Sequence, residues 1–527
     1  MPVSVSYPGV YIEEIPSGVR TIANVATSIT AFVGKAVRGP ASDPVTITSF
    51  ADFERLFGGL HRDFTLGYAV RDFFLNGGAI AIIVRLYKPT NNKGSKSSFN
   101  ISNLSLEAAN EGAWGQKLRV RIEKKAATDP NLAAAAQRLG LTPADLFDVV
   151  VRDGNTGRIE TFLNLTTKES ARRADRVLKN ESSLIRSTQA LPAATAPAAA
   201  AGALTDADVW TDATKSTPAQ STATTEAVDS AAVGATEFKA GVALLEKTDL
   251  FNLLCILPDT RDGDVPDDVY QDALGACARR RAFLIVDSKT GWNSISNAQT
   301  GVAGMNLNGD AARNGAVFFP RIKQADPMLD GQIETLPASG MIAGVMARTD
   351  AQRGVWKAPA GTDAALLGVA GLQLNTTDAE NGLLNPLGIN GLRTMPVFGS
   401  VVWGARTLRG ADAAADEYKY IPVRRTALFI EESLYRGLKW VVFEPNDEPL
   451  WAQIRLNVGA FMHNMFRQGA FQGKTPREAY LVKCDSETTT QNDINLGIVN
   501  ILVGFAPLKP AEFVIIKLQQ LAGQIQA

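Results

Sequence analysis

Histidine, the side chain whose charge changes most readily near neutral pH, occurs only twice in the 527 residues of this chain. His61 and His463 do not have the paired spacing of a metal site, and no Gly-x-Ser-x-Gly motif marks a hydrolase nucleophile. The adjacent carboxylates Glu431 and Glu432 point apart on a helix or strand, so they do not make an acid/base pair. These residue types and spacings predict no catalytic site and no enzyme.

An acidic cluster between residues 259 and 268 is the strongest candidate for a metal site. Calcium prefers oxygen ligands, but the spacing of these carboxylates does not match the EF-hand loop. The cluster precedes a predicted helix, where aspartates commonly cap free backbone N–H groups. We therefore predict helix capping and no metal at its members, which are Asp259, Asp262, Asp264, Asp267 and Asp268.

The cysteines Cys255, Cys277 and Cys484 lie far apart and fit neither a disulfide framework nor a paired metal-ligand motif. Cys255 falls in the apolar run FNLLCIL at residues 251–257, where a small buried thiol is expected rather than a redox role. No Gly-x-x-x-x-Gly-Lys-Ser/Thr loop for nucleotide phosphates is present. The sequence therefore predicts no cofactor, and folding in a cytoplasm is the default.

The charge balance of 53 basic and 54 acidic residues provides no overall field for nucleic acid or an anionic membrane. We expect no direct partner of either kind. A chain of this length, with 45% hydrophobic residues, is expected to form roughly two to four domains. Its N-terminus lacks a secretory signal, and no run of roughly 18 apolar residues predicts a membrane helix. Release from the producing cell would require lysis or another machine.

Alternating strand and helix signals place an α/β core in two separate parts of the sequence. In the first part we predict a strand at 29–34, helices at 49–57 and 65–75, and a strand at 79–86. In the second part we predict the Cys255 strand, a helix at 269–280, a strand at 282–286, and strands or helices at 316–320 and 340–348. Residues 91–241 interrupt this core with strand signals at 118–123 and 147–165 and an Ala-, Thr- and Ser-rich end. Beyond residue 391 we predict a strand at 397–403 and helices at 426–440 and 448–468.

Both chain ends carry the alternating pattern of β-strands, although chain ends normally fray. Pattern alone favours edge strands of the chain's own sheet, and strands donated to neighbouring chains are the alternative. The strand residues are Val3, Val5, Tyr7, Val10, Tyr11 and Ile12 at one end and Phe513, Val514, Ile515, Ile516 and Leu518 at the other.

Several separated blocks of the sequence carry a family resemblance. They read YPGVYIEE at 7–14, FVGKAVRGP at 32–40, FFLNGG at 73–78, AGVMARTD at 343–350, GVWKAPAG at 354–361, LNPLGIN at 384–390, YIPVRR at 420–425 and FEPN at 443–446. These blocks resemble the contractile tail sheath family of phages, pyocins and extracellular contractile injection systems. The block at 354–361 is the most specific, and the resemblance does not extend over the insertion.

The resemblance implies an α/β (α+β) sheath fold that is discontinuous and has several domains. The parts would be an N-terminal arm at 1–20, a core domain at 21–90 plus 242–390, a variable outward-facing mainly β insertion at 91–241, a C-terminal domain facing an inner tube at 391–510, and a C-terminal arm at 511–527. The arms would leave the body near 15–18 and 507–510. In sheath proteins of this family, such arms add strands to the sheets of neighbouring subunits.

The resemblance also implies a mechanical function. Subunits would form stacked hexameric rings in an extended metastable state and contract to drive the tube through a target envelope. The implied partners are further copies of the chain, the inner tube protein, and baseplate and terminator (cap) proteins. Assembly would occur in the bacterial host cytoplasm, and the product would be a virion tail or a released extracellular particle.

Contact with the tube is expected from the helix at 426–440 and from two arginines placed just before it. The residues concerned are Arg424, Arg425, Glu431, Glu432, Arg436 and Lys439. A solvated charged face is the alternative for this helix. For the whole chain, two alternatives remain open: a baseplate or tail-tip protein that shares the sheath's terminal domain, and an enzyme whose site lacks a short motif.

Overall fold

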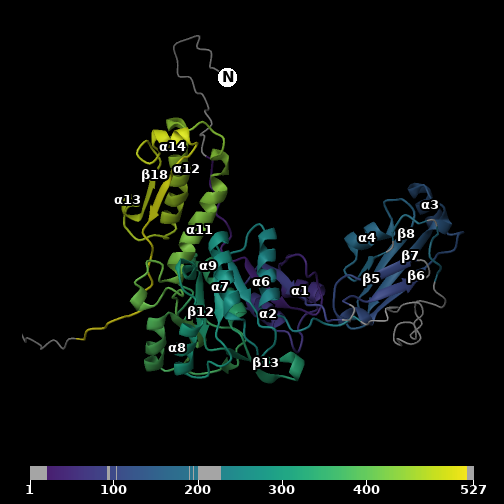
Figure 1. Ribbon diagram of the computed structural model, residues 1–527, viewed down its shortest axis with the longest axis horizontal. Coiled ribbons are helices and arrows are strands. Elements are labelled where there is room, and N and C mark those ends of the chain that lie inside the picture. Colours follow the sequence, from purple (N-terminus) through teal and green to yellow (C-terminus); the bar gives the residue numbers. More distant parts are fainter. Residues whose placement is uncertain are drawn as a thin grey trace, which may run out of the picture. The chain divides into compact units, whose positions relative to one another are not determined.

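The computed structural model describes residues 20–91, 95–101, 104–188, 190–193, 195–199 and 227–518. The chain forms two compact units. The core unit combines residues 28–348 and 360–415, and the C-terminal unit combines residues 1–27, 349–359 and 416–527. Each unit is therefore built from segments that are far apart in the sequence (Figure 1).

An eight-stranded sheet is the centre of the core unit, in the order β17-β16-β12-β11-β10-β1-β3-β2. All strands between the two edges are parallel, and the edge strands β2 and β17 run antiparallel to their neighbours. The inner strands are runs of buried residues, as expected where both faces of a sheet are covered. The strands are β1 Thr30–Lys35, β2 Val45–Ile47, β3 Ala81–Leu86, β10 Leu253–Ile256, β11 Phe283–Asp287, β12 Gly315–Phe319, β16 Ile389–Met395 and β17 Gly399–Trp403.

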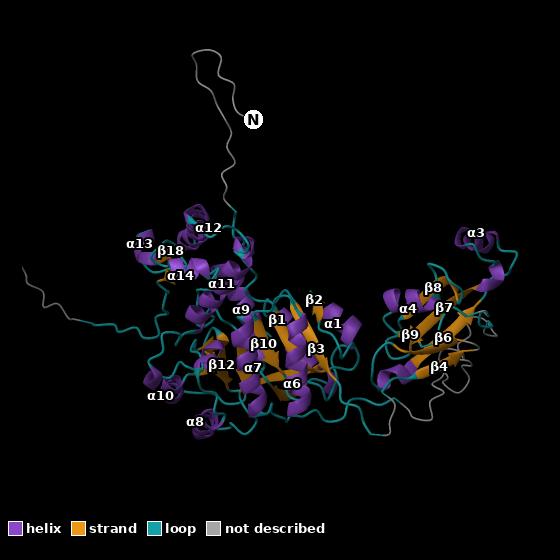
Figure 2. Ribbon diagram, turned by 45° about the horizontal axis from the view of Figure 1, so that its top comes forward, coloured by secondary structure: helices purple, strands orange, loops and turns teal. Residues whose placement is uncertain are grey.

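Helices cover both faces of this sheet. Helices α6 and α7 lie over one face (Figure 2), where Phe238 and Leu274 join the core that includes Ala31 and Val33 of β1. Phe32 points to the opposite face and meets Phe73 of α2 at a ring distance of 5.4 Å. The helices are α1 Phe50–Phe57, α2 Leu66–Leu75, α6 Ala235–Leu244, α7 Asp267–Arg280, α8 Ile295–Gly304, α9 Ser339–Arg353 and α10 Asp378–Leu384. A small sheet adds β13 Ile322–Asp326, β14 Gln332–Leu336 and β15 Gly371–Leu372.

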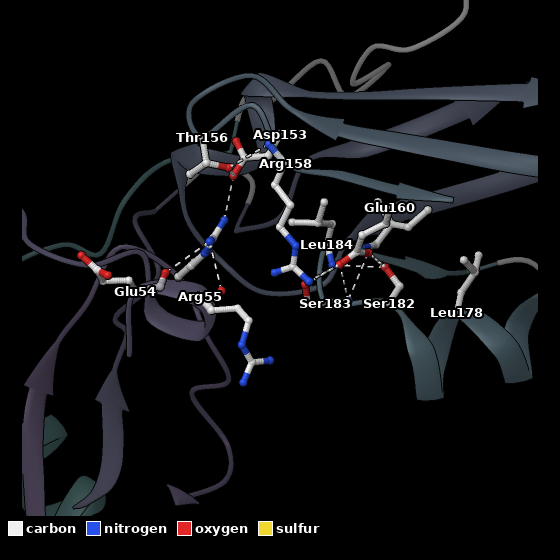
Figure 3. Close-up of polar contacts among 12 residues, drawn as sticks. Glu54, Arg55, Asp153, Thr156, Arg158, Glu160, Leu178, Ser182, Ser183 and Leu184 are labelled. Carbon is white, nitrogen blue, oxygen red and sulfur yellow. Dashed lines mark hydrogen bonds and ion pairs between the residues drawn. The ribbon is translucent and has the colours of Figure 1, made fainter. Parts of the chain in front are cut away.

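The insertion has a hydrophobic core of its own, formed by two three-stranded antiparallel sheets and helix α4. Its elements are β4 Ser98–Ile101, β5 Leu104–Ala108, β6 Leu118–Glu123, α3 Pro130–Leu139, β7 Leu146–Asp153, β8 Ile159–Thr166, α4 Ala174–Glu181 and β9 Ile185–Ser187. Glu160 of β8 accepts hydrogen bonds from the hydroxyl groups of Ser182 and Ser183 at 2.7 and 2.6 Å (Figure 3). This bond network connects β8 to the end of α4.

A buried ion pair joins the insertion to the rest of the core unit. Arg38 donates to the Asp153 carboxylate at 2.8 Å, and both side chains are at most 6% exposed. The same guanidinium donates to the carbonyl groups of Glu54 and Arg55, and the Thr156 hydroxyl donates to Asp153 (Figure 3). The charges are therefore paired and hydrogen-bonded, as buried charges must be.

The C-terminal unit is built around two long helices and a two-stranded sheet. Its elements are α11 Ile421–Gly437, α12 Glu448–Arg467, α13 Pro476–Ala479, β18 Tyr480–Lys483, α14 Gln491–Asn495 and β19 Leu502–Phe505. The apolar faces of α11 and α12 meet in a core that includes Phe429, Ile454, Phe461 and Met462. Among the described residues, no helix is both long enough and apolar enough to cross a membrane.

Several predicted boundaries differ from those of the structure. Strands β16 and β17 pair in the main sheet, so residues up to 415 belong with the core unit rather than with a C-terminal domain that begins at 391. Helix α6 packs on the main sheet, so the insertion ends before residue 235 instead of at 241. Helix α11 begins at Ile421 and not at 426, because Pro422 is well tolerated in the first turn of a helix. The residues predicted as N-terminal strands lie outside the described part of the chain.

Candidate assembly site

The N-terminal segment enters the C-terminal unit as an extended strap, defined here as residues 20–27. The backbone N–H of Arg20 donates to Asn457 Oδ1 of α12 at 3.0 Å, and its guanidinium lies 4.5 Å from the Trp440 ring. Ile22 is 5% exposed and packs into the core between α11 and α12. Close packing here depends on Gly437 of α11, because a Cβ atom at that position would lie 2.6 Å from the Ile22 side chain.

A buried ion pair fixes the other end of the strap. Arg425 of α11 donates two hydrogen bonds to the Asp350 carboxylate, at 2.9 and 2.5 Å, and one to the Thr27 carbonyl at 2.9 Å. The two charged side chains are 3% and 4% exposed. Burial raises the pKa of the Asp350 carboxyl, while the Arg425 charge opposes that shift. A bidentate pair of this kind fixes direction as well as distance, so the Arg425 guanidinium is held in place to bind the Thr27 carbonyl of the strap.

The two-stranded sheet offers open edges to a partner strand. Strands β18 and β19 pair with each other and, within the described residues, with no further strand. One face of this sheet packs on the unit's core through Val482 and Val503. The opposite face exposes Leu481 and Leu502, each 52% exposed. An unpaired edge presents free backbone donors and acceptors and can accept a strand from another chain.

The C-terminal segment runs away from this sheet. After β19, the Ala506 N–H donates to the Ala479 carbonyl at 2.8 Å, and the Tyr420 hydroxyl donates to Glu512 at 3.2 Å. Residues 513–518 then belong to no strand of the described chain, and their apolar side chains are 76% to 94% exposed. The segment is therefore not an edge strand of the chain's own sheet in this structure. The exposed side chains are Phe513, Val514, Ile515, Ile516 and Leu518.

The helix expected to contact a tube has a buried and an exposed side. Arg425 is buried in the Asp350 ion pair, and Glu432 is 5% exposed and pairs with Arg436 at 2.7 Å. Arg424 pairs with Glu431 at 3.2 Å and lies over the Tyr418 ring. The two arginines lie inside the first turns of α11 rather than before it.

An exposed stripe runs along α11 and into the 3-10 turn Lys439–Val441 that follows it. Glu431 and Tyr435 lie four residues apart on the helix, which ends at Gly437 and not at the predicted residue 440, and Lys439 begins the turn. All three are exposed, and the Lys439 ammonium group lies 5.5 Å from the Tyr435 ring. A partner can reach this exposed stripe. The spacing of the charged residues in the sequence did not distinguish its residues from Arg425 and Glu432, which are buried.

The histidines and cysteines considered as catalytic or metal-binding residues either contact aromatic side chains or are buried. His61 stacks on Phe64 at 4.3 Å, and His463 lies 3.3 Å from the Tyr480 hydroxyl. Burial raises the pKa of the Cys255 and Cys277 thiols above the ordinary range. Across the described ranges, no group of three or more His, Cys, Asp or Glu side chains has the arrangement of a metal site.

Four of the five aspartates in the acidic cluster form ion pairs. The N-cap of α7 is Pro266, which makes no side-chain capping bond, so the capping prediction is wrong for this helix. Asp267 and Asp268 lie in its first turn, where negative charge interacts favourably with the helix dipole. The ion pairs are Asp259 with Lys35, Asp264 with Arg321, Asp267 with Lys289 and Asp268 with Lys239, at 2.6 to 2.8 Å.

Sequence comparison identifies the C-terminal unit. Residues 413–520 match the family model of the phage tail sheath C-terminal domain. The tail sheath protein of Vibrio phage KVP40 is 26% identical over 235 residues, which are 44% of this chain and 33% of the phage protein. The tail sheath protein of Enterobacteria phage T4 is 25% identical over 237 residues, 43% of this chain and 34% of that protein. The chain thus spans about one third of the length of these curated relatives.

Solved structures share the fold of the whole chain. A chain of the anti-feeding prophage baseplate matches with a TM-score of 0.54 and 24% identity, covering 98% of this chain and 99% of that one. A chain of the contracted sheath of an extracellular contractile injection system, PVC, has a TM-score of 0.57 and 21% identity, with 98% coverage of both. A sheath tail protein from Listeria innocua has a TM-score of 0.57 at 12% identity, covering 93% and 96%. The predicted fold is confirmed.

Proposed function

We propose that this chain, which has a phage tail sheath C-terminal domain and the fold of contractile tail sheath proteins, is the structural sheath subunit of a contractile injection particle. The observation that supports this most strongly is the C-terminal segment, whose apolar side chains at residues 513–518 are exposed and pair with no strand of the described chain. Such a segment needs a partner surface. A neighbouring copy in a polymer supplies one.

The arms hold the polymer together in this proposal. Residues 513–518 of one copy add to an open edge of the β18–β19 sheet of another, and the N-terminal residues before the strap do the same. Strand addition satisfies backbone hydrogen bonds at each edge, and alternate side chains contribute specificity. The contacts of Arg20 with Asn457 and Trp440 fix where the N-terminal arm leaves the unit, and the Arg425–Asp350 pair holds the other end of the strap at Thr27.

Contraction requires no nucleotide in this proposal. A lattice assembled in an extended metastable state can store its free energy in bistable interfaces and release it as the subunits move. Folded units joined by arms tolerate such movement, because an arm remains paired with its neighbour while the units change position. The chain would act mechanically and not as an enzyme.

The exposed stripe on α11 and the turn after it is the proposed contact with an inner tube. It carries Glu431, Tyr435 and Lys439, with the partly exposed Arg424 and Arg436 beside it. A mixed-charge surface suits a contact that must form during assembly and then slide, because exposed ion pairs are individually weak. Baseplate and terminator proteins would bind the two ends of the polymer. The product would assemble in the host cytoplasm and work in a phage tail or in a released particle.

Electron microscopy of the purified chain tests the proposed function. We expect long, wide, hollow tubes, and a chain that stays monomeric in every buffer would contradict the proposal. Two valine substitutions then test the strap. Gly437→Val forces Ile22 out of its site and should reduce tube formation, because no space exists for the new side chain. Gly459→Val, on a surface of α12 where nothing lies within 4 Å of the new Cβ, should leave tubes intact.

A further inference from the structure

The hairpin between β16 and β17 ends in an exposed apolar tip, defined here as Val397 and Phe398. Val397 is 98% exposed and Phe398 is 52% exposed. Val397 also has a φ of 74°, after Pro396, a combination typical of a type II turn in which glycine or asparagine is usual. A β-branched residue in this conformation is strained. Two exposed apolar side chains lower the solubility of the chain, and the turn conformation strains Val397. A contact with another chain explains why both residues are nevertheless present at the tip.

A pocket of about 510 Å³ lies near the opposite edge of the same sheet. Its lining is mixed: Ile29, Ile80, Ile82 and Leu250, in or just before the strands β1, β3 and β10, form an apolar part, and Thr46, Thr248 and Asp249 add polar groups. Ile80 is 36% exposed, which is unusual for a residue that leads into a buried strand. At the rim, Lys247 pairs with Asp43 at 2.7 Å, and both side chains are more than half exposed. The apolar part of the pocket can accept an apolar side chain, and the polar groups around it can bind the backbone of a docked segment.

The tip and the pocket lie at diagonally opposite corners of the sheet. The tip follows the carboxyl end of β16 beside the edge strand β17, while the pocket lies at the amino ends of β1 and β3 beside the edge strand β2. Strands spaced about 4.8 Å apart separate the two edges by roughly 34 Å, so a chain cannot fill its own pocket. The length of the strands adds an offset of about 20 Å along their direction.

We propose that the Val397–Phe398 tip of one copy docks into this pocket of the next copy. This inference rests on the proposed function, because it assigns a specific contact within the polymer. A contact between two different surfaces of the same chain is head-to-tail, and it continues indefinitely unless the rotation closes a ring. The diagonal placement of the two sites makes successive copies rise along the strand direction. The contact therefore favours a helical row of core units and adds a second connection besides the arms.

Cysteine cross-linking tests the contact in assembled tubes. The chain's own cysteines are buried, so cysteines introduced at exposed sites react selectively. We expect the Phe398→Cys, Ile80→Cys double variant to form a ladder of disulfide-linked oligomers on mild oxidation. A control that combines Phe398→Cys with Leu163→Cys, on the exposed face of β8, should give no ladder. Tubes without a ladder, or an equal ladder from the control, would overturn the inference.

A second variant keeps the test valid if the cysteine pair does not assemble. Phe398→Ser removes the larger apolar side chain of the tip and should raise the critical concentration for tube formation about 10- to 100-fold. Ile159→Ser, at a 56% exposed apolar position of the insertion, should leave that concentration unchanged. An unchanged value for Phe398→Ser would refute the docking contact but leave the proposed function standing. Failure of the unmodified chain to form tubes would count against both.

Discussion

Replacing Asp350 by alanine should destabilise the C-terminal unit more than any surface change of similar size. The carboxylate is 4% exposed and is the acceptor of two hydrogen bonds from Arg425, which is itself 3% exposed. Without it, the guanidinium stays buried and keeps only the Thr27 carbonyl among these acceptors. Removing one partner of a buried ion pair costs about 3–5 kcal/mol, because the remaining charge is left uncompensated.

The double variant Asp350→Leu, Arg425→Met distinguishes the stability cost of an unpaired charge from the cost of lost packing. It removes both charges and retains apolar volume, so it should lose less stability than Asp350→Ala alone. Glu448→Gln is the control: it weakens the exposed pair with Arg455, 2.6 Å long, and should cost less than about 1 kcal/mol.

Hydrogen exchange of the monomer, followed in peptides from α11 and α12, is the suitable assay. The chain has two units, so a single unfolding temperature would not report on one of them. We expect the free energy of opening of these helices to fall by about 3–5 kcal/mol in Asp350→Ala. A loss below about 1 kcal/mol, equal to that of the surface control, would refute the reasoning that the pair organises the unit.

Two further predictions concern buried groups of the core unit. Burial raises the pKa of Asp72 to about 6, against Arg71 and Gln324, so the folded chain holds a proton that the unfolded chain releases near pH 4. Stability of the core unit should therefore fall as the pH rises from about 4 to 6. Asp72→Asn should abolish that slope in the free energy of opening of α2, measured by hydrogen exchange, and an unchanged slope would show that other groups cause it. Burial also raises the pKa of the Cys255 and Cys277 thiols. A thiol reagent at pH 8 should therefore leave both cysteines unmodified in the folded chain and label both in urea. Rapid labelling without urea would contradict their buried placement.

Local signals in the sequence predicted most elements of the core unit. The strand predicted at 29–34 is β1, Thr30–Lys35, and the helix predicted at 49–57 is α1, which Ser49 caps by accepting from the Asp52 N–H. Continuous apolar runs and helix-capping residues are local patterns that span only a few positions. They therefore predict strands and helix ends without knowledge of the tertiary structure. The strand-like pattern at 513–518 could not say whether its partner lies in the same chain. That choice depends on the tertiary structure.

Contacts between residues far apart in the sequence could not be predicted from local patterns. Strand β16 pairs through Ile389–Gly391 with β12, more than 70 positions earlier, and also with β17, so the domain boundary that the family resemblance implied at 391 lies later in the chain. Arg425 and Glu431 look equivalent as charges on a helix, yet one is buried against a carboxylate 75 positions away and the other is exposed. Side-chain spacing gives the relative direction of residues on a helix but not the side that the rest of the chain covers.

The most direct test of the arms is electron microscopy of two truncated chains, one lacking residues 1–15 and one lacking residues 511–527. Each should give a folded monomer with the circular dichroism of the intact units, because the helices and strands of the described chain lie between Thr30 and Phe505. Each should form no tubes under conditions in which the full chain forms them. Normal tubes from either truncated chain would contradict the claim that its arm holds the polymer together.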